Sequence, residues 1–207
     1  VYDVDLKVVG GASAIRLEVL PDPSLPGGGP GRAPLFRVGD FLLTEVEATA
    51  RPEGSSEAPR KLKFAQVTQD FAAKGFEAAK AIDGVTDTGW SVSGEIGRPH
   101  AAVFELADDI DGPTELHLTL HQEFIHQTTI GRFRLSVAPG PRPIAATGLT
   151  ADVEEILLVE PARRSPEQVQ VLTKYYLSIA PETAEARKPI VALRASAPKF
   201  ATTMVMR

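Results

Sequence analysis

The segment AIDGVTDTGW at residues 81–90, followed by the apolar run AAVFEL at residues 101–106, decides the fold of this chain. An apolar lead-in is followed by an Asp-Gly turn, a polar loop and the only tryptophan of the chain. Asp-Gly pairs favour tight turns, and a short apolar run bounded by turn residues is typical of a buried β-strand. The segment therefore predicts a looped corner that leads into a strand, as in a β-sandwich.

Short alternating strands are expected on both sides of this corner. In residues 115–124, for example, Leu116, Leu118 and Leu120 alternate with polar residues, which is typical of a strand with one buried face. The same reasoning predicts strands at residues 1–9, 14–20, 39–50, 61–67, 101–106, 115–124 and 131–137. Loops rich in glycine and proline separate them, and strands and helices do not alternate. The sequence therefore predicts a mainly β fold, an antiparallel β-sandwich.

The chain changes character after residue 138. The run PGPRP at residues 139–143 predicts a stiff linker over residues 139–149, and residues 150–207 are expected to form a helical connector to a following domain. Thr150 can cap a first helix, and Ser165-Pro166-Glu167-Gln168 is a capping box that begins a second. Pro181-Glu182 begins a third helix, which Pro189 is expected to kink or split.

Composition excludes several classes of protein. The formal net charge is -5 and lysine plus arginine number only 22, which argues against nucleic acid as a partner. The absence of cysteine excludes disulfides, thiolate nucleophiles and sulfur-ligated metal sites. No apolar run approaches the length of a membrane span, so none is expected in this piece.

Catalytic motifs are also missing from the sequence. It contains no G-x-S-x-G elbow, and the glycines at residues 27–29 are not followed by the Lys-Ser/Thr pair of a phosphate-binding loop. The carboxylate pairs Asp108-Asp109 and Glu154-Glu155 are expected in a turn and on a helix face, where charges are usually solvated. The sequence therefore predicts a protein that is not an enzyme.

The spacing Asp-Gly-x-x-x-Thr-x-Trp at residues 83–90 resembles that of the discoidin or coagulation factor type C family. Members of this family are galactose-binding-like jelly rolls, in which a loop of the form A-x-D-G-x-x-x-T-x-W often wraps a structural calcium ion. The resemblance implies a jelly-roll β-sandwich over residues 1–138 and a calcium site in the loop.

Residues 39–137 are also similar to a region of large multidomain planctomycete proteins. The segments that carry this resemblance are GDFLLTEVEATA, KAIDGVTDTGWSV, IGRPHAAVFEL and IGRFRLSV, and the final TTMVMR is similar to a junction sequence of the same proteins. Those proteins join a cytochrome-like module to uncharacterised domains. The resemblance implies a middle piece of a larger extracytoplasmic protein, periplasmic or at the cell surface, with neighbouring domains of the parent chain as partners.

The resemblance to the discoidin or coagulation factor type C family implies the calcium ligands. Asp83, Thr88 and loop carbonyls would surround the ion, and calcium takes six to eight oxygens. In the family, a glutamate in a strand of the form L-S-E-I-x-V completes the site, and LTEVEA at residues 43–48 matches that pattern. This segment precedes the loop instead of following it, so a role for Glu45 requires a permuted strand order. The alternative is that Asp83 only forms a turn with its own backbone.

Trp90 has two interpretations. Its indole face could stack on a pyranose ring, or the side chain could fill the core at the corner. Aromatic residues make up only 6% of the chain, and most phenylalanines fall on the inward side of the expected strands, which weakens the case for a lectin.

The polar sides of two strands supply the other candidate residues. His117 and His121 would lie about 13 Å apart on a strand, so they cannot chelate one ion together. If residues 131–137 pair with this strand, Arg132 and Arg134 add to a cationic face that could bind carboxylate or sulfate groups. The alternative is a solvated outer face with no ligand.

The sequence therefore predicts a non-catalytic carbohydrate-binding module, stabilised by calcium and suited to an acidic polysaccharide. The expected ligand-binding residues are Trp90, His117, His121, Arg132 and Arg134. The alternative is a structural or protein-interaction spacer without a sugar ligand.

Overall fold

The computed structural model describes residues 1–34, 38–124, 128–149 and 151–195. These residues fall into two compact units, Val1–Gly148 and Leu149–Arg207, each of which is described on its own. The first unit is mainly β, and the second is helical.

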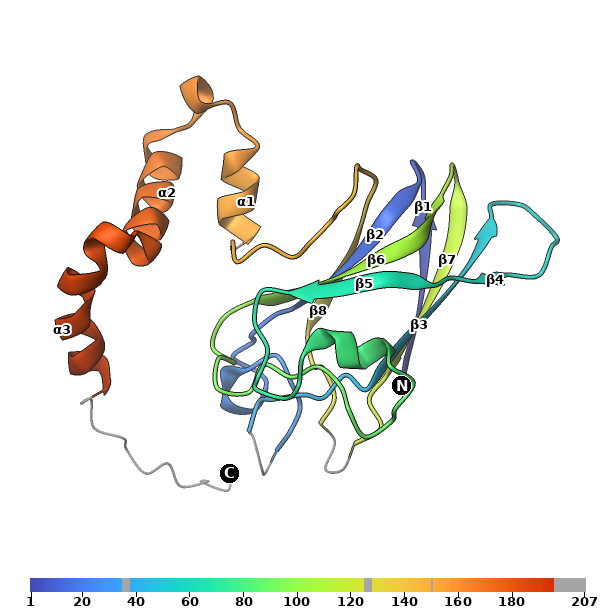
Figure 1. Ribbon diagram of the computed structural model, residues 1–207, viewed down its shortest axis with the longest axis horizontal. Coiled ribbons are helices and arrows are strands. Elements are labelled where there is room, and N and C mark those ends of the chain that lie inside the picture. The colour runs from blue at the N-terminus through green and yellow to red at the C-terminus, as the bar shows by residue number, and fades with distance from the viewer. Residues whose placement is uncertain (35–37, 125–127, 150, 196–207) are drawn as a thin grey trace. The chain divides into compact units, whose positions relative to one another are not determined.

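The first unit contains two antiparallel four-stranded sheets, which lie face to face in Figure 1. Sheet A has the strand order β1-β7-β3-β4, and sheet B has the order β5-β6-β2-β8. The strands are β1 (Tyr2–Val8), β2 (Ala12–Val19), β3 (Glu45–Pro52), β4 (Arg60–Lys61), β5 (Phe64–Gln69), β6 (His100–Ile110), β7 (Thr114–His121) and β8 (Phe133–Ala138). The expected mainly β, antiparallel two-sheet architecture is confirmed.

Side chains that alternate in direction along each strand form the core between the sheets. Leu116, Leu118 and Leu120 of β7 are buried, and the residues that alternate with these leucines are only partly buried. Ile15 and Leu17 of β2 are also buried. Apolar side chains from both sheets form one cluster. Because each strand turns one face inward, the polar residues of β1, β3 and β7 are left on the outer face of sheet A.

The segments at residues 39–50 and 61–67 do not each form one continuous strand, as was expected from the sequence. Only the second half of the first becomes β3, because Leu43 pairs with Trp90 through two backbone hydrogen bonds of 3.0 and 2.9 Å. The second segment divides into β4 and β5, which belong to different sheets. The buried Leu62 lies between them, where the chain passes from sheet A to sheet B.

The segment expected as a linker is bonded to the β unit over much of its length. Arg142 donates to the Glu105 carboxylate of β6 at 3.2 Å and to that of Asp109 at 2.5 Å. The Ile144 amide donates to Glu105 at 2.6 Å, and the Ala146 amide donates to the Thr68 hydroxyl at 2.7 Å. Residues 142–146 therefore form a strap over β5 and β6.

The second unit contains α1 (Ala151–Leu157), α2 (Pro166–Ile179) and α3 (Ala184–Ala195). The capping box at the start of α2 is confirmed, with reciprocal bonds between Ser165 and Gln168. Helix α3 continues through Pro189, so of the two expected effects, a kink or a split, the split does not occur. Thr150, the expected first cap, lies outside the described residues. Within the described ranges, no helix combines the length and apolarity needed to cross a membrane.

Candidate functional site

The Asp83 carboxylate organises the loop that precedes Trp90. Its Oδ1 atom accepts from the Val85 amide at 2.9 Å, and the Thr88 hydroxyl lies 3.1 and 2.9 Å from the two carboxylate oxygens. Gly84 has a φ of 79°, a conformation that glycine adopts without steric cost. The aspartate therefore forms the side-chain-to-backbone turn that the sequence suggested as one alternative.

Glu45, at the start of β3, lies beside this loop. Its Oε1 atom accepts from the amides of Gly84 and Val85 at 2.6 and 3.1 Å. The pairing of Leu43 with Trp90 brings the two segments together, since Glu45 follows one partner and the loop precedes the other. Desolvation raises the pKa of the Glu45 carboxyl, and the neighbouring negative charge of Asp83 raises it further, against the lowering effect of the two amides.

The oxygens that could hold a cation here belong to Glu45, Asp83 and Thr88. Two carboxylates close together favour either a shared proton or a cation, and carboxylate and hydroxyl oxygens suit a hard cation such as calcium. In the described part of the chain, no cluster of three or more His, Cys, Asp or Glu side chains could hold a metal ion. Calcium binding by these two carboxylates and the hydroxyl remains a prediction.

Trp90 belongs to the core. Its side chain is fully buried, its ring meets Phe41 edge to face at a centroid distance of 5.4 Å, and its indole N–H donates to the Phe71 carbonyl at 3.0 Å. Gly89 permits this packing, because a Cβ atom there would lie 2.2 Å from the Leu43 carbonyl oxygen. The sugar-stacking alternative for Trp90 is wrong, since no face of the indole reaches solvent.

His117 and His121 lie on the outer face of sheet A. The His117 Nδ1 atom is 2.7 Å from the Asp5 carboxylate, and Nε2 is 3.5 Å from Asp3. These carboxylates raise the pKa of His117, chiefly through the hydrogen bond with Asp5 and despite partial desolvation. His121 lies between Glu47 and Glu123, at 3.7 and 3.5 Å.

Arg132 and Arg134 do not join the histidines. The expected pairing of their strand with β7 is wrong, because β8 pairs with β2 in sheet B, whereas β7 pairs with β1 and β3 in sheet A. Arg134 makes a two-pronged ion pair with Glu18 at 2.6 and 2.9 Å, and Arg132 pairs with Asp22 at 3.0 Å. The combined cationic face predicted from the sequence is therefore not formed.

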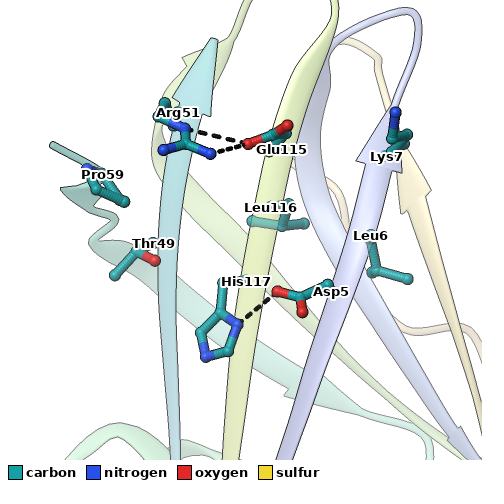
Figure 2. A pocket seen from close by; sticks show the side chains of 9 residues that line it. All are labelled: Asp5, Leu6, Lys7, Thr49, Arg51, Pro59, Glu115, Leu116 and His117. Atoms are coloured by element: carbon teal, nitrogen blue, oxygen red, sulfur yellow. Dashed lines mark hydrogen bonds and ion pairs between the residues drawn. The ribbon is translucent and has the colours of Figure 1, made fainter. Parts of the chain in front are cut away.

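The described residues instead enclose a groove on the outer face of sheet A, with a volume of about 630 Å³. Figure 2 shows Arg51 directed at Glu115 and His117 directed at Asp5, from three adjacent strands. Ionic side chains of both signs face the groove, so its charge is roughly balanced. The lining residues are Asp5, Leu6, Lys7, Thr49, Arg51, Pro59, Glu115, Leu116 and His117.

Among these lining residues, only His117 was predicted from the sequence as a site residue. The alternation of charged residues along β1 and β3 could have suggested that Asp5 and Arg51 point outward. It could not reveal that Asp5 and Thr49 both lie opposite His117, because that register depends on which strands pair. The hairpin that brings Pro59 to the groove depends in turn on β4.

Comparison with known proteins identifies no relative: no protein-family model, curated protein or solved structure matches the chain. The resemblance to galactose-binding-like domains therefore remains a prediction from the motif alone.

Proposed function

We propose that the β unit is a non-catalytic carbohydrate-binding module whose ligand lies in the groove on sheet A. The observation that carries this proposal is the clustering of hydrogen-bonding side chains from β1, β7 and β3 around one hollow of about 630 Å³. Carboxylates accept hydrogen bonds and guanidinium groups donate them, so a pair such as Arg51 and Glu115 complements hydroxyl groups, which do both.

The charge of the groove favours a neutral glycan over the acidic polysaccharide expected from the sequence. Asp5 and Glu115 offset Lys7 and Arg51 in the lining, so only a protonated His117 would add positive charge to attract a polyanion. The arginines that would have supplied such charge are paired with Glu18 and Asp22 in another part of the fold.

The neighbouring side chains hold the polar groups of the groove in place. Asp5 fixes one nitrogen of His117, and the Nε and Nη2 atoms of Arg51 both contact Glu115. Groups that are already oriented lose less rotational freedom when a ligand binds. A guanidinium has five N–H donors, so Arg51 can contact a ligand and Glu115 together.

A glycan array on the full chain tests the function. It should include neutral, uronic-acid and sulfated polysaccharides, each with calcium and with chelator. We expect selective binding of a neutral glycan, weakened at least tenfold by Arg51→Ala or His117→Ala. Arg132→Ala is the matched control, since it removes an arginine outside the groove. Binding that depends on Arg132 and not on Arg51 would refute the groove, and preference for sulfated chains would refute the neutral ligand.

We further propose a structural calcium ion held by Asp83, Thr88 and Glu45. Desolvation and, after it, the negative charge of Asp83 raise the pKa of Glu45, and the ion would offset the repulsion between the two carboxylates. We expect calcium to raise the melting temperature of the wild-type chain and to have no effect on Asp83→Ala. Identical melting of the wild-type chain in calcium and in chelator would refute this site.

The finer description of the fold is part of the same proposal. The Asp83–Trp90 motif supports a galactose-binding-like jelly roll, and the similarity of residues 39–137 supports a place in a larger extracytoplasmic planctomycete protein. Full-length protein located by cell fractionation, followed by an experimental structure of the β unit, would test both statements.

The alternative, a protein-interaction spacer, is favoured by one observation in the helical unit. Val169, Tyr176 and Ile179 of α2 are large apolar side chains with about half of their surface exposed. Apolar groups left in water favour contact with a partner, here a neighbouring domain of the parent chain. A folded chain that binds nothing on the array would favour this function over carbohydrate binding.

A further inference from the structure

We infer that the ligand of sheet A is a linear oligosaccharide that lies along β7, and not a single sugar. This inference rests on the proposed carbohydrate function. Two hollows on the same outer face support it: the groove beside Arg51 and Glu115, and a second hollow of about 290 Å³. The second hollow borders the proposed calcium site, and its lining residues are Glu45, Glu47, Gly84, Thr86, His121 and Glu123.

The register of sheet A sets the distance between the hollows. The outward side chains of β7 follow one another in the order Glu115, His117, Thr119 and His121. His117 lines the first hollow and His121 lines the second, and four residues of strand separate them by about 13 Å. A single sugar in the groove cannot reach the second hollow, whereas a chain of several units can.

Polar groups connect the two hollows without a break. Thr119 donates to Asp3 at 2.9 Å and lies 3.4 Å from the Nε2 atom of His117. On the other side of β7, Glu47 lies opposite Thr119 and contacts both Lys61, at 2.5 Å, and His121, at 3.7 Å. A chain along β7 would therefore meet hydrogen-bonding side chains over its whole length.

Energetics also favour a chain over a single unit. Among the described residues that line the two hollows there is no Phe, Tyr or Trp, so a sugar in either depends mainly on hydrogen bonds. Each such bond contributes little net free energy, because it replaces a bond with water. One sugar would bind weakly, and contacts in the second hollow would add to its affinity. A gain of about 1.4 kcal/mol corresponds to tenfold tighter binding.

Isothermal titration of the full chain with oligosaccharides of increasing length tests this inference. The probes are β-1,4-linked chains of glucose, of xylose and of mannose, from the monosaccharide to the hexasaccharide. We expect the affinity for the series that binds to rise at least tenfold from the monosaccharide to the longest chain. Circular dichroism and the emission of the buried Trp90 verify that each variant is folded.

Two variants locate the chain on the sheet. His121→Ala should reduce the ratio of long-chain to short-chain affinity toward one, since it removes a side chain from the second hollow. Arg132→Ala, outside both hollows, should keep the wild-type ratio. An unchanged ratio in His121→Ala would overturn the position of the chain along β7.

Failure of this inference differs from failure of the proposed function. Equal affinity for a monosaccharide and a hexasaccharide would overturn the chain while leaving a carbohydrate site in the groove. No binding of any probe at any length, with the folded state verified, would overturn the carbohydrate function and the chain together.

Discussion

The carboxylates of this protein differ in pKa because their surroundings differ. Glu45 is partly desolvated and lies beside Asp83, and its pKa is raised. Glu105 accepts from the Ile144 amide, Gln66 and Arg142, and its pKa is lowered, chiefly by the amide. Hydrogen-bond donors stabilise an ionised carboxylate, whereas burial and a like charge destabilise it.

Glu45 should make the protein less stable as the pH rises. Below its ordinary pKa of about 4.5 it is protonated in both the folded and the unfolded state. Above that value the unfolded state loses the proton first, so the free energy of unfolding falls until the folded carboxyl has also ionised. Glu45→Gln keeps an oxygen acceptor for the Gly84 and Val85 amides and removes this dependence.

We therefore expect the melting temperature of Glu45→Gln, relative to wild type, to rise between about pH 4 and pH 7 in the presence of chelator. Thermal melts across this range measure it. Glu57→Gln, an exposed glutamate in the β3–β4 hairpin, is the control. A constant difference between Glu45→Gln and wild type would contradict the raised pKa.

At the scale of elements, side-chain bonds fix the ends of segments that have little other support. Ser165 caps the start of α2: its hydroxyl accepts from the Gln168 amide at 3.3 Å, while the Gln168 side chain accepts from the Ser165 amide at 2.9 Å. The strap at residues 142–146 is held by Glu105 and Thr68. Loss of one side chain should loosen one end of such an element.

Ser165→Ala should destabilise the first turn of α2 by about 1 kcal/mol, since the cap satisfies an amide that has no partner within the helix. Hydrogen exchange at the Gln168 amide measures the loss. Ser165→Asp should restore protection, because aspartate is an equally good cap. Equal exchange rates in the two variants would show that the cap does not stabilise the helix.

Glu105→Ala should release the strap. The Ile144 amide loses its acceptor and should exchange with solvent faster, and exchange at Ala146 shows whether the rest of the strap follows. Asp108→Ala, an exposed carboxylate on the same strand, is the control.

Lowering the pH should also release the strap at residues 142–146 in the wild-type chain. The pKa of Glu105 is lowered, so its stabilising contribution is present above the ordinary value of about 4.5 and is lost as the pH falls through the lower folded value. Protection of Ile144 that is unaffected both by the substitution and by acid would exclude Glu105 as its anchor.

At the scale of the whole molecule, one apolar cluster joins the two sheets of the β unit. It includes Leu118 of sheet A and Phe104 of sheet B, together with the corner residue Trp90. The outer face of sheet A takes no part in this cluster and is free to vary in chemistry. The polar side chains of the groove can therefore be altered by substitution with little effect on the core, whereas Leu116, which also lines the groove, belongs to the cluster.

Leu118→Ala should lower the free energy of unfolding of the β unit by about 2–5 kcal/mol, the usual cost of removing a fully buried leucine side chain. Urea unfolding followed by the emission of Trp90 measures this cost. Ser136→Ala, at an exposed position of β8, should change it by less than about 0.5 kcal/mol. Similar losses in the two variants would contradict the assignment of Leu118 to the core.

The sequence by itself determined the local features: the inward leucines of β7, the Asp83 turn, the capping box of α2 and the mainly β architecture. Each of these depends on residues that are near one another along the chain, through alternation, turn geometry or a helix cap. That is why they can be recognised without knowledge of any distant contact.

Only the tertiary structure decided which strands are neighbours. It separated Arg134 from His117, brought Asp5 and Thr49 to either side of that histidine, and joined Glu45 to the Asp83 loop. Alternation along a strand indicates which of its faces points inward, but not which strand lies next to it. The choice of partner strand depends on the packing of the whole core. The candidate site is built from such neighbours, so it became visible only in the folded chain.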